Sequence, residues 1–233
     1  MKILNTKLLF LLIPLFWGCQ NATPKKPMVE TIEKNIVEKP KTKTPYDLAI
    51  ESVEAAKIRL KKSKFGSSIL YDSIPAILRG TTIDNIVFTD VNNNKIDLSA
   101  QNKPIFIQVS TSPSIPNKTE IPAINQLAFE YKDDVKFILI ACSGVERYNR
   151  AKEHYDEGIS VITSEEFDCQ ASINVQGFKH VTGYPFHYFL DKELKIINCG
   201  LGDYYESPER YADYREKIYN TIKTDLDALL KKN

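Results

Sequence analysis

The stretch that decides the fold is Lys103–Pro122, which runs KPIFIQVSTSPSIPNKTEIP. The apolar run from Ile105 to Val109 predicts a buried strand, and the serine- and proline-rich segment after it predicts a turn. Apolar residues then recur at helical spacing, at Ala123, Ile124, Leu127 and Ala128. We therefore expect a central strand, a turn, and a helix that begins where the strand ends.

The elements around this stretch alternate along the chain. We expect a hairpin (83–91 and 95–98), a strand (135–142), a helix (145–155), a connection (158–182), a second hairpin (186–190 and 194–199), and a terminal helix that begins at Ser207-Pro208. The strand–helix–strand order predicts parallel pairing in the centre of the sheet. Two hairpins beside a parallel unit indicate an α/β domain with a mixed sheet.

Two segments resemble the thioredoxin-like family, in its TlpA-like and redoxin (AhpC/TSA) branch. Val181–Ile196 is similar to the pattern V-x-G-x-P-x-x-x-F-L-D-K-x-x-x-I, and Glu120–Asn125 is similar to a helix that continues E-M-P-x-L-N. The resemblance spans about residues 80–230. It implies an α/β, thioredoxin-like three-layer sandwich, with a mixed sheet flanked by helices and an N-terminal extension of a helix and a β-hairpin. It also implies that Pro185 is cis and faces the active site.

The resemblance places Ser114 and Asn117 where that branch has its two cysteines. Dithiol exchange needs a thiolate at the helix N-terminus and a second thiol that resolves the mixed disulfide. A serine hydroxyl without an adjacent base does neither. We therefore expect no catalytic residue at these degenerate active-site positions, and we expect Ser114 to cap the helix with Pro116 in its first turn.

Binding can persist where catalysis is lost. Relatives bind extended peptides by strand-like pairing beside the cis-proline. The candidate binding groove therefore consists of Ser114, Pro116, Tyr184 and Pro185.

The N-terminus predicts export and a lipid anchor. Lys2 and Lys7 flank an apolar run that is shorter than the roughly 20 residues of a membrane span, which is typical of a signal peptide. Gly18-Cys19 resembles the lipobox of bacterial lipoproteins, which implies lipidation of Cys19; the alternative is an ordinary secretory signal. We expect a signal peptide (1–18), a flexible tether (19–43), an N-terminal helical extension (44–79) and a thioredoxin-like domain (80–233).

The helical extension has a clear start signal. Thr44-Pro45-Tyr46-Asp47 predicts an N-cap followed by proline in the first turn. The apolar stripe of this helix is expected at Leu48, Val53, Ala56, Ile58 and Leu60.

The cysteines of the body are expected to be mainly structural. Cys142 and Cys199 end apolar strands and are predicted to be buried. Cys169 lies in a polar connection, and a disulfide between Cys142 and Cys169 is an open alternative in an oxidising compartment.

The histidines do not suggest a metal site. His154, His180 and His187 are not at zinc-ligand spacing with each other or with cysteines, so no metal and no cofactor is expected. His187 is predicted to be a structural residue whose hydrogen bonds are satisfied.

The charge balance gives no reason to expect a nucleic-acid partner. The chain has 31 basic and 30 acidic side chains and a formal net charge of +1. Its overall electrostatic field therefore does not attract a polyanion. Our leading hypothesis is a lipid-anchored interaction module of the bacterial cell envelope, on the periplasmic side or the outer surface. Its partners would be the membrane, through Cys19, and an extended polypeptide or envelope protein. The alternatives are a thiol-disulfide oxidoreductase that uses Cys169 or Cys142, and a structural spacer.

Overall fold

The structure is a computed structural model that describes residues 42–61, 66–110, 115–142, 154–163, 173–202 and 211–231. The signal peptide, most of the tether, and residues 145–153 of the helix expected at 145–155 lie outside these residues. The helices are α1 (Pro45–Leu60), α2 (Gly66–Leu78), α3 (Ile115–Glu130) and α5 (Tyr211–Leu230), with a short 3-10 helix η1 (Ser99–Gln101). None of the helices described here has the length and apolarity needed to cross a membrane.

Five strands form the central sheet, in the order β5-β4-β3-β8-β9. They are β3 (Ile105–Ser110), β4 (Lys136–Ala141), β5 (Ser160–Thr163), β8 (Phe186–Leu190) and β9 (Ile196–Leu201). The first three are parallel, and β8 and β9 join them as an antiparallel hairpin. Two small hairpins, β1 (Val87–Thr89) with β2 (Lys95–Asp97) and β6 (Ile173–Val175) with β7 (Phe178–His180), lie outside this sheet.

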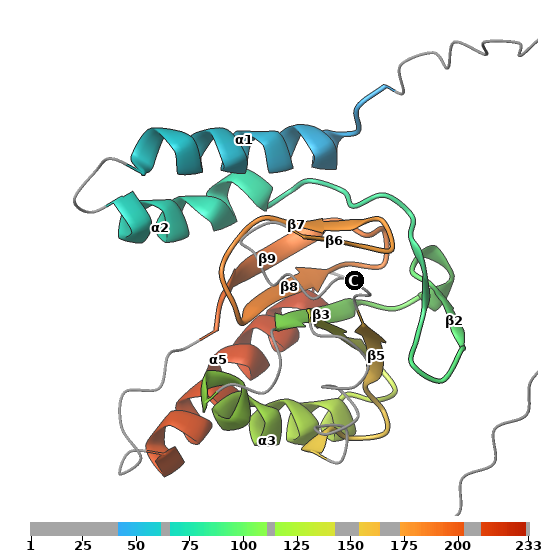
Figure 1. Cartoon of the computed structure of the whole chain (residues 1–233). Helices are drawn as coiled ribbons and strands as arrows, with labels where there is room; N and C mark the ends of the chain where they lie inside the picture. The colour runs from blue at the N-terminus through green and yellow to red at the C-terminus, as the bar shows by residue number, and fades with distance from the viewer. Residues whose placement is uncertain are drawn as a thin grey trace, which may run out of the picture. The chain divides into compact units, whose positions relative to one another are not determined.

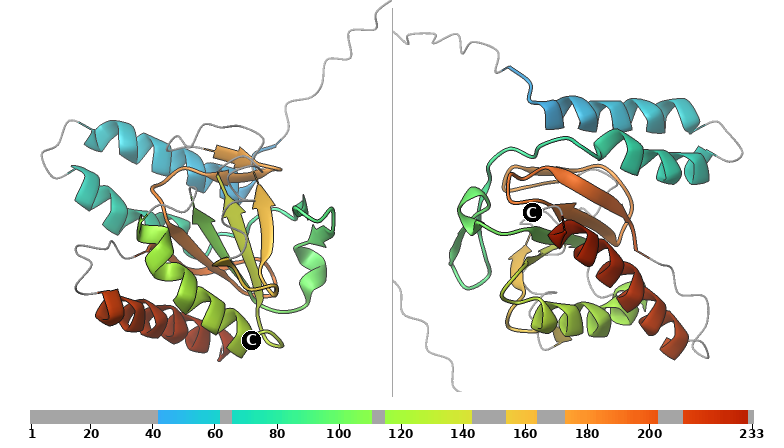
Figure 2. Two further views of the ribbon diagram at one scale, coloured as in Figure 1. Left: turned by 60° about the horizontal axis from the view of Figure 1, so that its bottom comes forward. Right: turned by 180° about the vertical axis from the view of Figure 1, so that it is seen from behind.

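The helices and hairpins cover the two faces of the sheet. In Figures 1 and 2, α1, α2 and the β6–β7 hairpin lie on one face, and α3 and α5 lie on the other. Each face has its own apolar core, one containing Ile107, Phe178 and Tyr188, and the other containing Phe106 and Leu226. This is the thioredoxin-like α/β fold, with a mixed five-stranded sheet, that the resemblance implied.

The predicted start of α1 is confirmed. The Thr44 hydroxyl accepts a hydrogen bond from the Asp47 amide, and the Asp47 carboxylate accepts one from the Thr44 amide. This reciprocal capping satisfies two amides that the helix leaves unpaired. The capping box therefore fixes the start of α1 at the position that the sequence predicts.

The predicted apolar stripe of α1 is wrong at two positions. The buried residues are Tyr46, Ala49, Ile50, Val53 and Ala56, whereas Leu48 and Ile58 are exposed. Successive helical residues are about 100° apart, so a residue two positions from a buried one lies roughly on the opposite side of the helix. Leu48 and Ile58 are each two positions from a buried residue.

The connection expected at 158–182 contains three strands in the described part. β5 extends the sheet beside β4, and β6 and β7 form a hairpin over the other face. Gln176 and Gly177 have φ values of 51° and 99°, which a two-residue turn of this kind requires. Gly177, which lies in the turn between the apolar residues Val175 and Phe178, is the local sequence signal for this hairpin.

Candidate functional site

The Tyr184-Pro185 bond is cis, as the resemblance implied. Pro185 is buried and Tyr184 is half-buried. The Pro185 carbonyl accepts a hydrogen bond of 2.9 Å from the Gly202 amide, which ties this loop to the end of β9. Of the other predicted groove residues, Ser114 lies outside the described residues, and Pro116, like Asn117, is described only as backbone of the first turn of α3.

Three buried polar side chains lie together beneath α3, and the sequence analysis did not predict their association. Gln108 and His187 are direct partners across β3 and β8, and Glu120 reaches them from α3. Gln108 Nε2 donates a hydrogen bond of 2.7 Å to Glu120 Oε2. His187 Nε2 lies 3.4 Å from the same oxygen, and its ring lies against Phe106.

This cluster is incompletely satisfied. Gln108 Oε1, Glu120 Oε1 and His187 Nε2 are buried atoms with no hydrogen-bond partner among the described residues. The prediction that His187 is a satisfied structural residue is therefore wrong. The polar side chains of three elements meet there, and their mutual contacts do not use all their donors and acceptors. Unpaired buried polar atoms are uncommon in native folds and require an explanation.

Glycines on β9 and just after it shape the space around the cluster. A Cβ on Gly202 would lie 2.0 Å from Glu120 Oε1 and 2.8 Å from Pro185 Cγ, so the carboxyl occupies the space that a side chain would need. A Cβ on Gly200, the register partner of His187, would have no atom of the described residues within 4 Å. The site is thus closed at Gly202 and open at Gly200.

Helix α1 holds the segment that leads into Tyr184. The Tyr46 hydroxyl donates to the Lys179 carbonyl at 2.6 Å, and Lys57 Nζ donates to the Val181 carbonyl at 2.9 Å. Lys179 also forms an ion pair with Asp47. Two alternate carbonyls of this segment are therefore already engaged by side chains of α1.

His180 anchors the same segment from inside the core. Its Nε2 lies 3.2 Å from the Gly183 carbonyl, which can only accept, so Nε2 carries the proton and Nδ1 accepts from the Tyr188 hydroxyl at 2.9 Å. Burial lowers the pKa of His180 to about 3, so the ring is neutral. A neutral, fully bonded histidine fixes the backbone that precedes Tyr184.

The described cysteines are buried, as predicted. Cys142 is 1% exposed and Cys199 is 4% exposed. Burial raises the pKa of the Cys199 thiol to about 12. Cys19 and Cys169 lie outside the described residues, so lipidation and the Cys142–Cys169 disulfide remain predictions.

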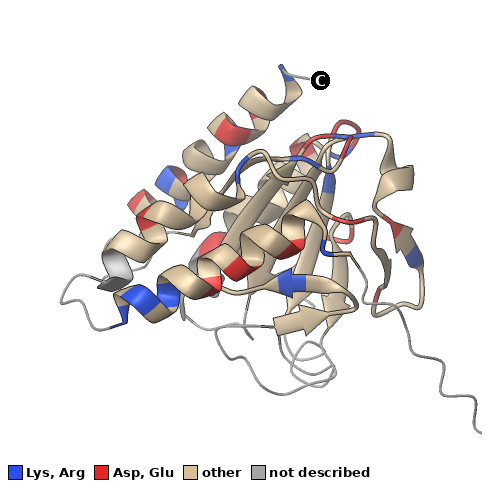
Figure 3. Cartoon of the chain, turned by 90° about the horizontal axis from the view of Figure 1, so that it is seen from above, with Lys and Arg blue, Asp and Glu red and all other residues tan. Residues whose placement is uncertain are grey.

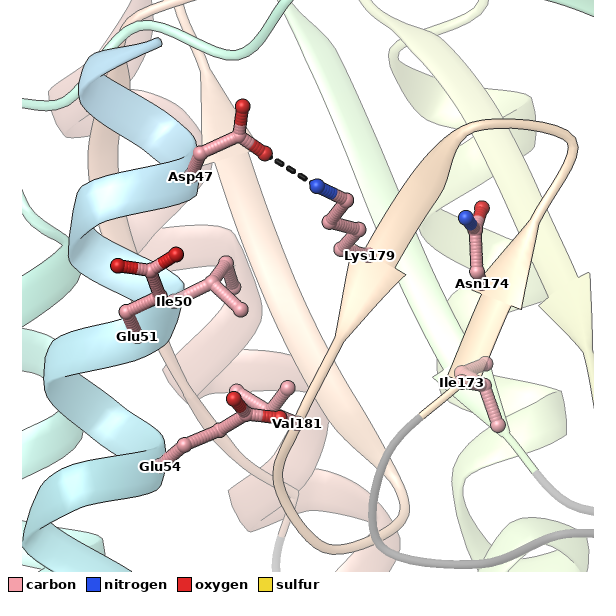
Figure 4. Close-up of a pocket in the computed structure, with 8 residues that line it drawn as sticks. All are labelled: Asp47, Ile50, Glu51, Glu54, Ile173, Asn174, Lys179 and Val181. Atoms are coloured by element: carbon pink, nitrogen blue, oxygen red, sulfur yellow. Dashed lines mark hydrogen bonds and ion pairs between the residues drawn. The ribbon is translucent and has the colours of Figure 1, made fainter. Parts of the chain in front are cut away.

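A cavity of about 390 Å³ lies elsewhere, between α1 and the β6–β7 hairpin, and contains none of the predicted site residues (Figure 4). Ile50 and Val181 contribute its apolar part, and carboxylates of α1 lie along its rim. Asp47 is paired with Lys179, and Glu51 is paired with Lys43 at 2.6 Å. Figure 3 shows acidic residues along α1 and basic ones toward its C-terminal end. These ion pairs engage two of the three carboxylates that line the cavity, Asp47 and Glu51.

No group of three or more histidine, cysteine, aspartate or glutamate side chains within the described ranges is arranged to hold a metal ion. The cluster beneath α3 combines one histidine, one glutamate and one glutamine.

Comparisons with solved structures find similar chains at low sequence identity. No protein-family model and no curated protein matches the chain. A chain named as a thiol:disulfide interchange protein DsbE from Chlorobium tepidum is 15% identical, with a TM-score of 0.49 over 65% of this chain and 97% of that one. The thioredoxin domain of a thiol-disulfide oxidoreductase from Bacteroides vulgatus is 15% identical, with a TM-score of 0.43 over 63% and 96%. The exposed lipoprotein thioredoxin of Streptococcus pneumoniae is 17% identical, with a TM-score of 0.40 over 57% and 98%. These similarities concern the fold and carry no activity over to this chain.

Proposed function

We propose that the chain is a lipid-anchored, thioredoxin-like module of the bacterial cell envelope that binds a partner and performs no dithiol exchange. The observation that carries the proposal is the burial of Cys142 and Cys199 in a chain with Ser114 and Asn117 at the degenerate active-site positions. A reactive thiol must be accessible and must ionise readily. Cys199 has the opposite properties, and Cys142 is equally inaccessible, which counts against the alternative in which Cys142 is the working thiol.

Within this proposal, the partner contact lies at Tyr184 and the cis-proline that follows it. Tyr46 and Lys57 engage the Lys179 and Val181 carbonyls, and the Pro185 carbonyl is bonded to Gly202. Strand-like pairing with an extended polypeptide is therefore restricted to the short stretch around Tyr184. Because that stretch is short, side-chain contacts of the half-buried Tyr184 ring would supply part of the affinity.

Photo-crosslinking in cells tests this contact. A benzophenone amino acid replaces Tyr184 in the full chain, and the control carries it at Phe129, an exposed position on α3. We expect a discrete polypeptide adduct at position 184 that is absent at 129. The crosslinked segment, made as a synthetic peptide, should bind the wild-type chain, and Tyr184→Ala should weaken that binding at least tenfold. Identical adducts at both positions, or a peptide that binds the Tyr184→Ala variant equally well, would contradict the assignment.

The anchor is tested separately. Cys19→Ser should move the protein from the membrane fraction to the soluble envelope fraction, because it removes the proposed acylation site. Unchanged membrane association of Cys19→Ser would show that lipid on Cys19 does not hold the protein at the membrane.

A further inference from the structure

We infer that Tyr71 of α2 is a specificity-determining residue of the proposed partner site, where it selects an apolar side chain of the bound polypeptide. The inference rests on the proposed function, because it extends the contact at Tyr184 onto a second element. Helix α2 belongs to the helical extension, which precedes the span of the family resemblance, so the resemblance implies nothing about it.

Helix α2 runs along β9 and starts at the end of the sheet where the cis-proline loop lies. Just after the helix, the Gly80 amide donates a hydrogen bond of 2.8 Å to the Ile196 carbonyl, at the first residue of β9. Near the start of the helix, Tyr71 lies against Gly183 and against Leu201, the last residue of β9. In Figure 1, α2 and α3 both start at this end of the sheet.

Gly183 allows Tyr71 to lie directly against the backbone that precedes Tyr184. A Cβ on Gly183 would lie 3.2 Å from Tyr71 Oη, 3.5 Å from Tyr71 Cε1 and 3.3 Å from Leu201 Cδ2. Two of these distances are shorter than the roughly 3.5–4.0 Å of an ordinary carbon contact. The Tyr71 ring therefore takes the place beside the loop that a side chain of residue 183 would need.

Tyr71 is open to solvent although it lies on the inward side of α2. Ile74 and Leu78, three and seven positions later, are fully buried, and residues at these spacings share one side of a helix. Tyr71 itself is 39% exposed, and Tyr184 and Leu201 are half-buried. Two aromatic rings and one aliphatic side chain thus flank Gly183 at the surface, which is the composition that protein interfaces favour at their centre.

The composition of α2 defines the side chain that fits there. Asp72 is the only charged residue among the 13 residues of the helix. A charged side chain of the partner would lose hydration against the Tyr71 ring and Leu201. An apolar side chain would instead bury aromatic and aliphatic surface with them. The surface therefore fits an extended polypeptide with an apolar side chain close to the residue that contacts Tyr184.

Photo-crosslinking from α2 tests the inference. The benzophenone amino acid replaces Tyr71 in the full chain, and the control carries it at Ile69, which is 46% exposed and lies two positions away, roughly on the opposite side of the helix. Position 71 should label the same polypeptide as position 184. The two labelled points should lie within about five residues of each other, because an extended chain advances about 3.3 Å per residue and Tyr71 touches the residue before Tyr184. Position 69 should give no such adduct.

Binding of the synthetic peptide identified from position 184 tests the apolar selection. Tyr71→Ala should weaken that binding about tenfold, whereas Tyr71→Phe, which keeps the ring, should weaken it less than twofold. Ile69→Ala should leave it unchanged. Aspartate in place of the peptide residue that labels position 71 should weaken binding to the wild-type chain about tenfold, and much less to the Tyr71→Ala variant. Far-UV circular dichroism of each variant should match the wild type.

The outcomes separate this inference from the proposed function. A peptide that depends on Tyr184 but binds Tyr71→Ala as tightly as the wild type would overturn the inference and leave the proposed function standing. An adduct at position 71 with a different polypeptide would do the same. No adduct at position 184 would contradict the proposed contact itself, and the inference with it.

Discussion

Gly202→Ala should destabilise the fold by about 3 kcal/mol. The added Cβ would lie 2.0 Å from Glu120 Oε1 and 2.8 Å from Pro185 Cγ, so the buried carboxyl must move. Overpacking of this kind costs about 1–3 kcal/mol. The displaced carboxyl also loses its hydrogen bond from Gln108, which leaves buried groups unpaired at a cost of about 1–3 kcal/mol. In a chain of this size, a loss of 3 kcal/mol corresponds to a decrease in Tm of about 6–12 °C.

The assay is urea unfolding followed by far-UV circular dichroism. Gly200→Ala is the matched control, two residues away, and should change the free energy of unfolding by less than about 0.5 kcal/mol because the added Cβ meets no described atom. Combining Gly202→Ala with Glu120→Ala should give a coupling energy above about 1 kcal/mol, because removing the carboxyl relieves the collision. Equal effects of the two glycine substitutions, or no coupling to Glu120, would refute the placement of Glu120 over Gly202.

Two buried titratable groups determine how the free energy of unfolding depends on pH, and one buried hydrogen bond contributes to that free energy. The Cys199 thiol stays protonated in the folded chain but ionises in the unfolded one, so stability should fall as pH rises from about 9 toward about 12; Cys199→Ala should remove that part of the slope, and an identical slope would contradict it. His180 has a pKa of about 3 against an ordinary value of 6.5, so the unfolded state binds the extra proton and stability should fall by up to about 1.4 kcal/mol per unit as pH drops from 6.5 toward 3. Urea midpoints at successive pH values should show a flatter curve for His180→Gln. Tyr46→Phe removes the donor to the Lys179 carbonyl and should cost about 1–2 kcal/mol in urea unfolding; a cost near zero would show that water replaces the hydroxyl.

The central elements were predictable because their sequence signals are local. Ile105–Val109 is apolar except for Gln108 because both faces of the sheet are covered, and strands buried on both sides have nearly continuous apolar runs. The β8–β9 hairpin and the start of α1 were also predictable, since a turn and a capping box each lie within a few residues. The cis bond before Pro185 came from resemblance, since nothing in the local residues specifies it.

The polar cluster could not be predicted because it depends on register. Gln108, Glu120 and His187 lie in three different elements, and no sequence pattern links them. They meet only because β8 pairs with β3 in one particular alignment and α3 crosses above that pair. A shift of one residue in that alignment would turn His187 to the opposite face. Gln108 inside an apolar strand was the one available signal, since a buried amide requires a partner.

A thiol redox titration of the full chain tests whether the protein performs dithiol exchange. The chain is equilibrated across glutathione buffers, and alkylated Cys142, Cys169 and Cys199 are counted by mass spectrometry. We expect Cys142 and Cys199 to remain unalkylated until the chain is denatured, and no pair of cysteines to exchange with the buffer. Two cysteines that titrate together at about −180 to −230 mV, the range of known exchange catalysts, would instead identify a thiol-disulfide oxidoreductase.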